Sequence, residues 1–211
     1  MILTCNFAIA ATLENSKNFA GPAIAIGGSS VATHSKLKHH LPDENSEFSV
    51  GDNKFVAVLN GSYLKDITDK WLIGGGVTYD LNSMSNHNAH YYLQGVGTYD
   101  SAIRISDHFS IYAQPTYALS PTTALFFKAA YHQAKVRISD SYFYTANTNQ
   151  KNDLHGFGLG IGAMIFLDKD IFTKLELEYV DYAKVTIPYN TTKISYRLST
   201  TSGTLSIGYR F

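Results

Sequence analysis

The feature that most constrains the fold is a strict two-residue alternation over residues 155–167. Glycine occupies every second position from Gly156 to Gly162, and apolar side chains occupy the positions between and beyond them. A period of two over this length predicts a β-strand rather than a helix. One face is apolar, and on the other glycine leaves room for large neighbours. The apolar positions are Phe157, Leu159, Ile161, Ala163, Ile165 and Leu167.

The same alternation recurs along the chain and predicts eight strands in all. In the first of them, Gly27 and Gly28 interrupt the pattern, and we expect a β-bulge there. The other seven segments lie near residues 21–34, 55–63, 73–79, 109–119, 125–131, 172–185 and 204–211.

The connections between these segments alternate in length. Three are tight turns and four are long, polar stretches. Short turns at one end and long loops at the other are typical of outer-membrane barrels. Residues His90 to Ile105 still alternate in part, which predicts strand extending beyond the membrane. The turns are 66–70, 120–123 and 168–170, and the loops are 36–53, 82–107, 140–153 and 188–196.

Charged residues make up only 16% of the chain, against about 25% in ordinary soluble domains. No segment approaches the roughly 20 apolar residues that a transmembrane helix requires. Strands survive in lipid only when a closed barrel pairs every backbone group. We therefore predict an all-β fold, an eight-stranded antiparallel up-and-down transmembrane β-barrel. The alternative is a soluble lipocalin-like barrel. Tyrosines expected in interfacial belts are Tyr63, Tyr79, Tyr117, Tyr131, Tyr179 and Tyr209.

The chain starts with a short apolar run that ends in small residues, Ala8-Ile9-Ala10. This is typical of the end of a secretory signal peptide. We expect a signal-peptide remnant over residues 1–10 and the barrel domain over residues 11–211. The single cysteine, Cys5, lies in the remnant and excludes an intrachain disulfide.

Four charged residues alternate with apolar ones and are expected to face the barrel lumen: Glu176, Glu178, Lys128 and Arg210. Buried charge is costly without a partner. We therefore expect a lumen charge network in which at least one glutamate pairs with Arg210 and Lys128 lies nearby.

Four stretches carry a family resemblance: Ala113–Leu119, Phe127–Tyr131, Leu177–Tyr179 and the terminal Gly208–Phe211. With them the chain resembles the opacity-protein/OmpX-like family of small outer-membrane barrels. The resemblance implies a bacterial outer-membrane location among outer-membrane lipids.

The end of the last strand resembles the signal that the outer-membrane insertion machinery recognises during assembly. Phe211 is the terminal residue, and the apolar positions before it alternate along the strand. The expected assembly signal is Leu205, Ile207, Tyr209 and Phe211.

Catalytic and ligand-binding motifs are weak. His108-Phe-Ser110 has the spacing of outer-membrane deacylases, but no carboxylate is evident to orient the histidine. His87 with His90, and His39 with His40, suggest no defined metal site without further ligands. Gly156, Gly158 and Gly160 precede no helix, so they make no nucleotide site. The formal net charge of the chain is zero, which does not indicate the excess of basic residues typical of nucleic-acid-binding proteins.

The sequence thus predicts a protein that is not an enzyme and has no cofactor or metal. Loops on a rigid scaffold are where recognition is usually placed. We expect a surface protein whose external loops serve interaction or adhesion with an unknown extracellular partner. The alternative is a narrow porin for small solutes.

Overall fold

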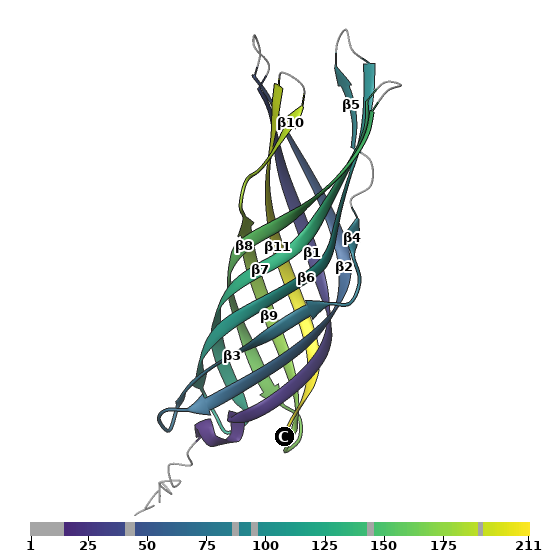
Figure 1. Cartoon of the computed structure of the whole chain (residues 1–211). Helices are drawn as coiled ribbons and strands as arrows, with labels where there is room; N and C mark the ends of the chain where they lie inside the picture. Colours follow the sequence, from purple (N-terminus) through teal and green to yellow (C-terminus); the bar gives the residue numbers. More distant parts are fainter. Residues whose placement is uncertain (1–14, 41–44, 86–88, 94–96, 143–145, 190–191) are drawn as a thin grey trace, which may run out of the picture.

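The computed structural model describes residues 15–40, 45–85, 89–93, 97–142, 146–189 and 192–211. It confirms the predicted closed, antiparallel barrel (Figure 1). The expected signal-peptide remnant lies outside the described residues. No described helix has the length and hydropathy to cross a membrane. The barrel strands are β1 (Gly21–His40), β2 (Asn45–Asp66), β3 (Trp71–Asp80), β6 (Gly97–Ala118), β7 (Thr123–Tyr142), β8 (Ala146–Phe166), β9 (Ile171–Tyr182) and β11 (Thr192–Arg210).

Each barrel strand pairs with its neighbours in the chain, and β1 also pairs with β11 to close the wall. The predicted bulge at Gly27 and Gly28 is wrong, because the pairing of β1 with β2 and β11 runs through both residues without a shift. Gly28 instead lies under the ring of Phe55, where a Cβ atom would collide. The register shift that the structure does show lies between Ser106 and Phe109, next to Asp107 with a φ of 51°.

The outer surface of the barrel carries an exposed apolar band, as a lipid-facing wall requires. Alternate residues of every strand contribute, such as Leu159 on β8 and Leu177 on β9. Aromatic side chains lie toward both edges of this band, as in interfacial belts. At the edge near the tight turns they are Tyr63, Trp71, Tyr209 and Phe211, and at the other edge Phe55, Tyr79, Tyr131, Phe157 and Tyr179.

At the end opposite the tight turns, the barrel divides into two arms (Figure 1). The division begins where β3 ends at Asp80 and β9 ends at Tyr182, because the longer neighbouring strands continue without them. The first arm consists of the outer parts of β1, β2 and β11 with β10 (Val185–Tyr189). The second arm consists of the outer parts of β6, β7 and β8 with β4 (Met84–Ser85) and β5 (Ala89–Leu93).

The arms correct the prediction that the four long, polar connections are loops. Most of residues 36–53, 140–153 and 188–196 continue the ladders of the barrel strands. Hydrogen-bonded ladders satisfy backbone groups in water as well as in lipid, so the strands do not end at the membrane edge. The expectation of extended strand within 82–107 is confirmed for β5 and the outer part of β6.

The lumen is filled in layers. Near the tight turns an apolar layer includes Phe172, Leu72 and Phe19. Phe19 belongs to the short 3₁₀ helix η1 (Asn15–Phe19), which lies at this end of the barrel (Figure 1). At the base of the arms a second apolar layer includes Val56 from the first arm and Val136 from the second. Buried polar and charged side chains occupy the space between the two layers.

Candidate functional site

The centre of the polar layer is Lys128 on β7, whose side chain is only 2% exposed. Its Nζ atom lies 2.7 Å from Oε1 of Glu176 and 3.0 Å from Oε2 of Glu178, both on β9. Alternation places the two glutamates on the same lumenal face of their strand. The structure thus brings together three of the four lumenal charges expected from the sequence.

Lys174, also on β9, adds a second cation to the cluster. Its Nζ atom lies 2.9 Å from Oε2 of Glu176 and 3.2 Å from Oε1 of Gln114. It also lies 4.5 Å from the ring centre of Phe126, within the range of a cation–π contact. The two lysines therefore balance the charges of the two buried glutamates.

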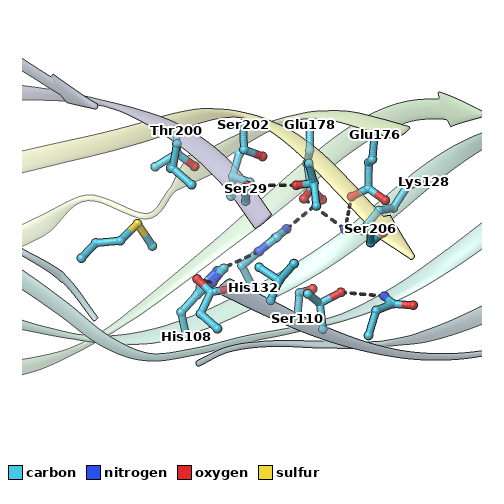
Figure 2. Close-up of a pocket in the computed structure, with 18 of the residues that line it drawn as sticks. Ser29, His108, Ser110, Lys128, His132, Glu176, Glu178, Thr200, Ser202 and Ser206 are labelled. Carbon is cyan, nitrogen blue, oxygen red and sulfur yellow. Dashed lines mark hydrogen bonds and ion pairs between the residues drawn. The ribbon is translucent and has the colours of Figure 1, made fainter. Parts of the chain in front are cut away.

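From Glu178 a chain of contacts continues toward the arms, as the dashed lines in Figure 2 show. Oε1 of Glu178 lies 3.1 Å from Nε2 of His132, and Nδ1 of His132 lies 3.0 Å from Nε2 of His108. Nδ1 of His108 lies 2.7 Å from Oδ2 of Asp80. Side chains from β3, β6, β7 and β9 thus form one connected network across the lumen.

The glycines of β8 make this network possible. A Cβ atom on Gly158 would lie 2.6 Å from Nε2 of His132 and 3.0 Å from Oε1 of Glu178. A Cβ atom on Gly162 would collide with the ring of Phe126. These contacts explain the alternating glycines, because the lumenal face of β8 must leave space for side chains from the neighbouring strands.

Little free volume remains around the network. The cavity that borders Lys128, His132 and Glu178 has a volume of about 60 Å³. Since one water molecule needs at least about 10–15 Å³ measured in this way, the cavity has room for a few water molecules. The lumen therefore has a polar centre that can be hydrated but is narrow.

Arg210 does not join the network, contrary to the sequence expectation. Its Nη2 atom lies 3.1 Å from Oδ1 of Asp170 and 3.2 Å from the carbonyl oxygen of Lys169, and its Nη1 atom donates to the carbonyl of Asn18. The physical reason is that Arg210 and Glu178 lie at different positions along the barrel axis. Glu178 pairs with Ser202, eight residues before Arg210 on β11, which is about 27 Å along a strand.

The four residues of the expected assembly signal are exposed; three of them share the outer face of β11, and Phe211 directly follows the end of that strand. At the end of the chain, the amide of Phe211 donates to the carbonyl of Pro22, and its ring packs edge-on against Tyr209. The face is therefore open to contact from outside the barrel wall. The residues are Leu205, Ile207, Tyr209 and Phe211.

The histidine of the His108-Phe-Ser110 motif has a carboxylate partner that the sequence did not reveal. Asp80 occupies the position needed to orient His108. The other ring nitrogen of His108, however, lies 3.0 Å from His132 and 3.3 Å from the hydroxyl of Tyr182, and no hydrogen bond joins it to Ser110 among the described residues. Within the same described ranges, no group of histidine, cysteine, aspartate and glutamate is arranged to hold a metal ion.

Comparison with known proteins agrees with this geometry. A family model described as outer membrane protein beta-barrel domain matches residues 14–211. No curated protein sequence matches the chain. The outer membrane protein OprG from Pseudomonas aeruginosa is similar in structure, with a TM-score of 0.58, 14% identity, and coverage of 91% of this chain and 96% of OprG.

Two further solved structures have the same fold. The outer membrane protease OmpT from Escherichia coli has a TM-score of 0.52 and 11% identity, covering 90% of this chain and 97% of OmpT. Ail, the attachment invasion locus protein of Yersinia pestis, solved with the heparin analogue sucrose octasulfate, has a TM-score of 0.50 and 14% identity, covering 91% of this chain and 99% of Ail. At these identities the similarity extends to the fold alone.

Proposed function

Because the chain belongs to the family of outer membrane protein beta-barrel domains, we propose that it is a non-enzymatic surface protein of the bacterial outer membrane. In this proposal the closed barrel anchors the two arms, and the arms make the contacts outside the cell. The observation that carries the proposal is the filled lumen beneath two long, paired strand extensions.

The lumen supports anchoring over transport. A solute would have to pass the apolar layer around Val56, the ion pairs of Lys128 and the apolar layer around Phe172. Eight strands enclose a space that side chains can just fill. The cavity of about 60 Å³ beside the ion pairs is too small for a solute larger than a few water molecules.

The surroundings of His108 support a non-enzymatic role. OmpT is a protease with a similar fold, so the fold alone does not decide this point. A general base must be within hydrogen-bond reach of the proton that it removes. Both ring nitrogens of His108 already lie within hydrogen-bond distance of protein groups, and its partner Asp80 is buried.

The contact function is tested by trimming each arm while keeping the barrel. Lys36 pairs with Ser49, so residues 37–48 can be replaced by an Asn-Gly turn suited to a two-residue hairpin. Ile138 pairs with Gln150, so residues 139–149 can be replaced likewise. Laboratory bacteria displaying the full chain should attach to an epithelial cell monolayer, and the trimmed variants should lose attachment. Equal attachment would refute the proposal.

Heat-modifiable gel mobility provides the control for folding of each trimmed variant.

The porin alternative is tested separately with the full chain in planar bilayers of phospholipid. We expect no discrete current steps from the wild-type protein. Reproducible single-channel steps that disappear when the protein is heat-denatured would favour the porin and contradict an anchor with a closed lumen.

A further inference from the structure

Two histidine rings contact each other inside the barrel. The rings of His108 on β6 and His132 on β7 are nearly parallel, with their centres 5.2 Å apart. Nε2 of His108 lies 3.0 Å from Nδ1 of His132, a contact drawn as a dashed line in Figure 2. The side chain of His132 is 2% exposed and that of His108 is 13% exposed. Both rings border the cavity of about 60 Å³, so protons can reach them through the few water molecules that it can hold.

The outer nitrogen of each ring is held by a carboxylate. Nδ1 of His108 lies 2.7 Å from Oδ2 of Asp80, and Nε2 of His132 lies 3.1 Å from Oε1 of Glu178. An ionised carboxylate only accepts hydrogen bonds, so both outer nitrogens carry a hydrogen. If both rings were neutral, the two inner nitrogens would therefore face each other with bare lone pairs. Their contact at 3.0 Å instead requires one hydrogen between them.

The balance of charge in the lumen leads to the same number of protons. The ammonium groups of Lys128 and Lys174 balance the two lumenal glutamates of β9. Asp80 is buried, and among the described residues its ion-pair partner is His108 rather than a lysine or arginine. Burial of a charge without compensation is very costly. One proton on the histidine pair supplies the positive charge that Asp80 lacks.

The other groups around the pair carry no further charge to it. In the described part of the barrel, the charged groups in contact with the pair are its two carboxylate partners. The hydroxyl of Tyr182 on β9 lies 3.3 Å from Nε2 of His108, and β8 presents glycine on this face. The side chains of β1, β2, β4 and β11 that line the same cavity are neutral. Asp107, the chain neighbour of His108, is exposed and pairs with Lys135.

The pair connects the two points at which the arms separate. Asp80 is the last residue of β3, and Tyr182 is the last residue of β9. His108 lies within hydrogen-bond distance of both, at 2.7 Å from Asp80 and 3.3 Å from the hydroxyl of Tyr182. The two strand ends are therefore linked across the lumen through one imidazole ring, and His132 holds that ring in place.

We propose that His108 and His132 bind one shared proton at neutral pH and form a pH-sensitive latch between the ends of β3 and β9. In mild acid a second proton gives both inner nitrogens a hydrogen. Two N–H groups cannot donate to each other, and two cationic rings in contact repel. The contact then breaks and releases the link at the base of the arms. The latch is independent of the contact function proposed for the arms.

The shared proton can be observed directly by nuclear magnetic resonance of the full chain with isotope-labelled histidine in detergent micelles. A hydrogen bonded between two nitrogens transmits a scalar coupling from one to the other. At pH 7 we expect this coupling between Nε2 of His108 and Nδ1 of His132. Nitrogen shifts of two neutral rings, with no coupling between them, would overturn the proposal. This measurement needs no variant and does not depend on how any substitution affects folding.

The latch is tested by urea unfolding in detergent at pH 6 and pH 5. The folded pair holds one proton, whereas its two histidines in the unfolded chain take up two below about pH 6.5. Stability falls with pH where the unfolded state binds more protons. We expect the folding equilibrium constant of the wild type to fall about fivefold between these values. His132→Gln, which keeps an amide donor for Glu178, should change less than about twofold.

The matched control is His155→Gln. It removes a histidine whose ring contacts Tyr131 on the outer side of the barrel, so the wild-type fall between pH 6 and pH 5 should remain. Heat-modifiable gel mobility shows whether each variant folds. An equal fall in His132→Gln and in the wild type would place the acid sensitivity outside the pair and overturn the latch.

Hydrogen exchange followed by mass spectrometry locates the release. Peptides that contain the ends of β3 and β9 should lose protection between pH 7 and pH 5 in the wild type, after correction for the chemical exchange rate. The same peptides should show no such loss in His132→Gln, which lacks the latch at both pH values. Wild-type protection that stays unchanged at both strand ends would contradict their release.

Discussion

The ammonium group of Lys128 lies 2.7 Å from a carboxylate oxygen of Glu176 in the middle of the barrel, and neither side chain is more than 10% exposed. An ion pair this deep depends on both partners, because each would otherwise be a buried charge without compensation.

Replacing Lys128 by methionine should therefore destabilise the protein by about 3–5 kcal/mol. The measurement is urea unfolding in detergent, followed by gel mobility. Lys135→Met is the matched control, since its partner Asp107 is at the exposed rim, and it should cost less than about 1 kcal/mol. Adding Glu178→Gln to Lys128→Met should recover part of the loss. Similar losses for the two methionine variants would contradict a buried network.

Arg210 should be coupled energetically to Asp170 and not to Glu178. Arg210→Ala and Asp170→Ala remove the same ion pair, so their combined loss of stability should be smaller than the sum of the single losses. Arg210→Ala and Glu178→Ala are distant and should add to within about 0.5 kcal/mol. Double-mutant cycles from urea unfolding make both comparisons. A coupling of Arg210 to Glu178 above 1 kcal/mol would contradict the strand register.

Gly158→Ala should separate His132 from Glu178, because the new methyl group would occupy the space between strands. Overpacking of this kind costs about 1–3 kcal/mol. Gly203→Ala is the control, since its Cβ atom would make an ordinary contact at 3.5 Å with Leu177. Unfolding in urea should show a loss for Gly158→Ala alone. Equal stability of the two variants would mean that β8 does not need its small lumenal residues.

Deletion of Phe211 should reduce assembly in cells because it removes the end of the expected recognition signal. The control is Phe157→Ala, which removes an equally exposed aromatic ring of the band, 74% against 73% for Phe211. Folded protein in outer-membrane fractions is measured by heat-modifiable mobility. The deletion should lower this yield, while refolding of the purified chain in detergent stays similar. An unchanged yield in cells would remove the assembly role.

The arms, and not the tight turns, should be accessible outside the cell. Protease added to intact bacteria should cut within 36–53 or 140–153, whose described residues lie in the arms. Mass spectrometry of the fragments locates the cuts, and permeabilised cells provide the comparison. Cleavage restricted to 66–70 or 168–170 in intact cells would invert the proposed orientation.

The alternation of side chains was enough to predict the barrel-spanning parts of the eight strands but not their extensions into the arms, because the face on which a residue lies depends only on its own strand. Leu177 and Glu178 show this, with the first on the apolar band and the second in the lumen. The tight turns could be predicted equally well from the sequence, because such short connections leave few choices of length. These are local properties of the chain.

The partners within the lumen depend instead on register, which alternation does not determine. Arg210 and Glu178 both face inward but lie at different positions along the barrel axis. Asp80 meets His108 through the pairing of β3 with β6, whose connection is too long to fix a register as a tight turn does. The sequence did indicate that the side chains of Asp80, His132 and Lys174 lie on the lumenal faces of their strands.

The pairing of β1 with β11 also bears on the order of folding. Ala23 pairs with Arg210 across nearly the whole chain, whereas most other ladders join strands that follow one another. Contacts so distant in sequence carry the largest loop-closure entropy and form slowly. Local hairpins can form early, but the wall stays open along this seam until the last strand arrives. The charges around Lys128 thus lose their water only in the final step of folding.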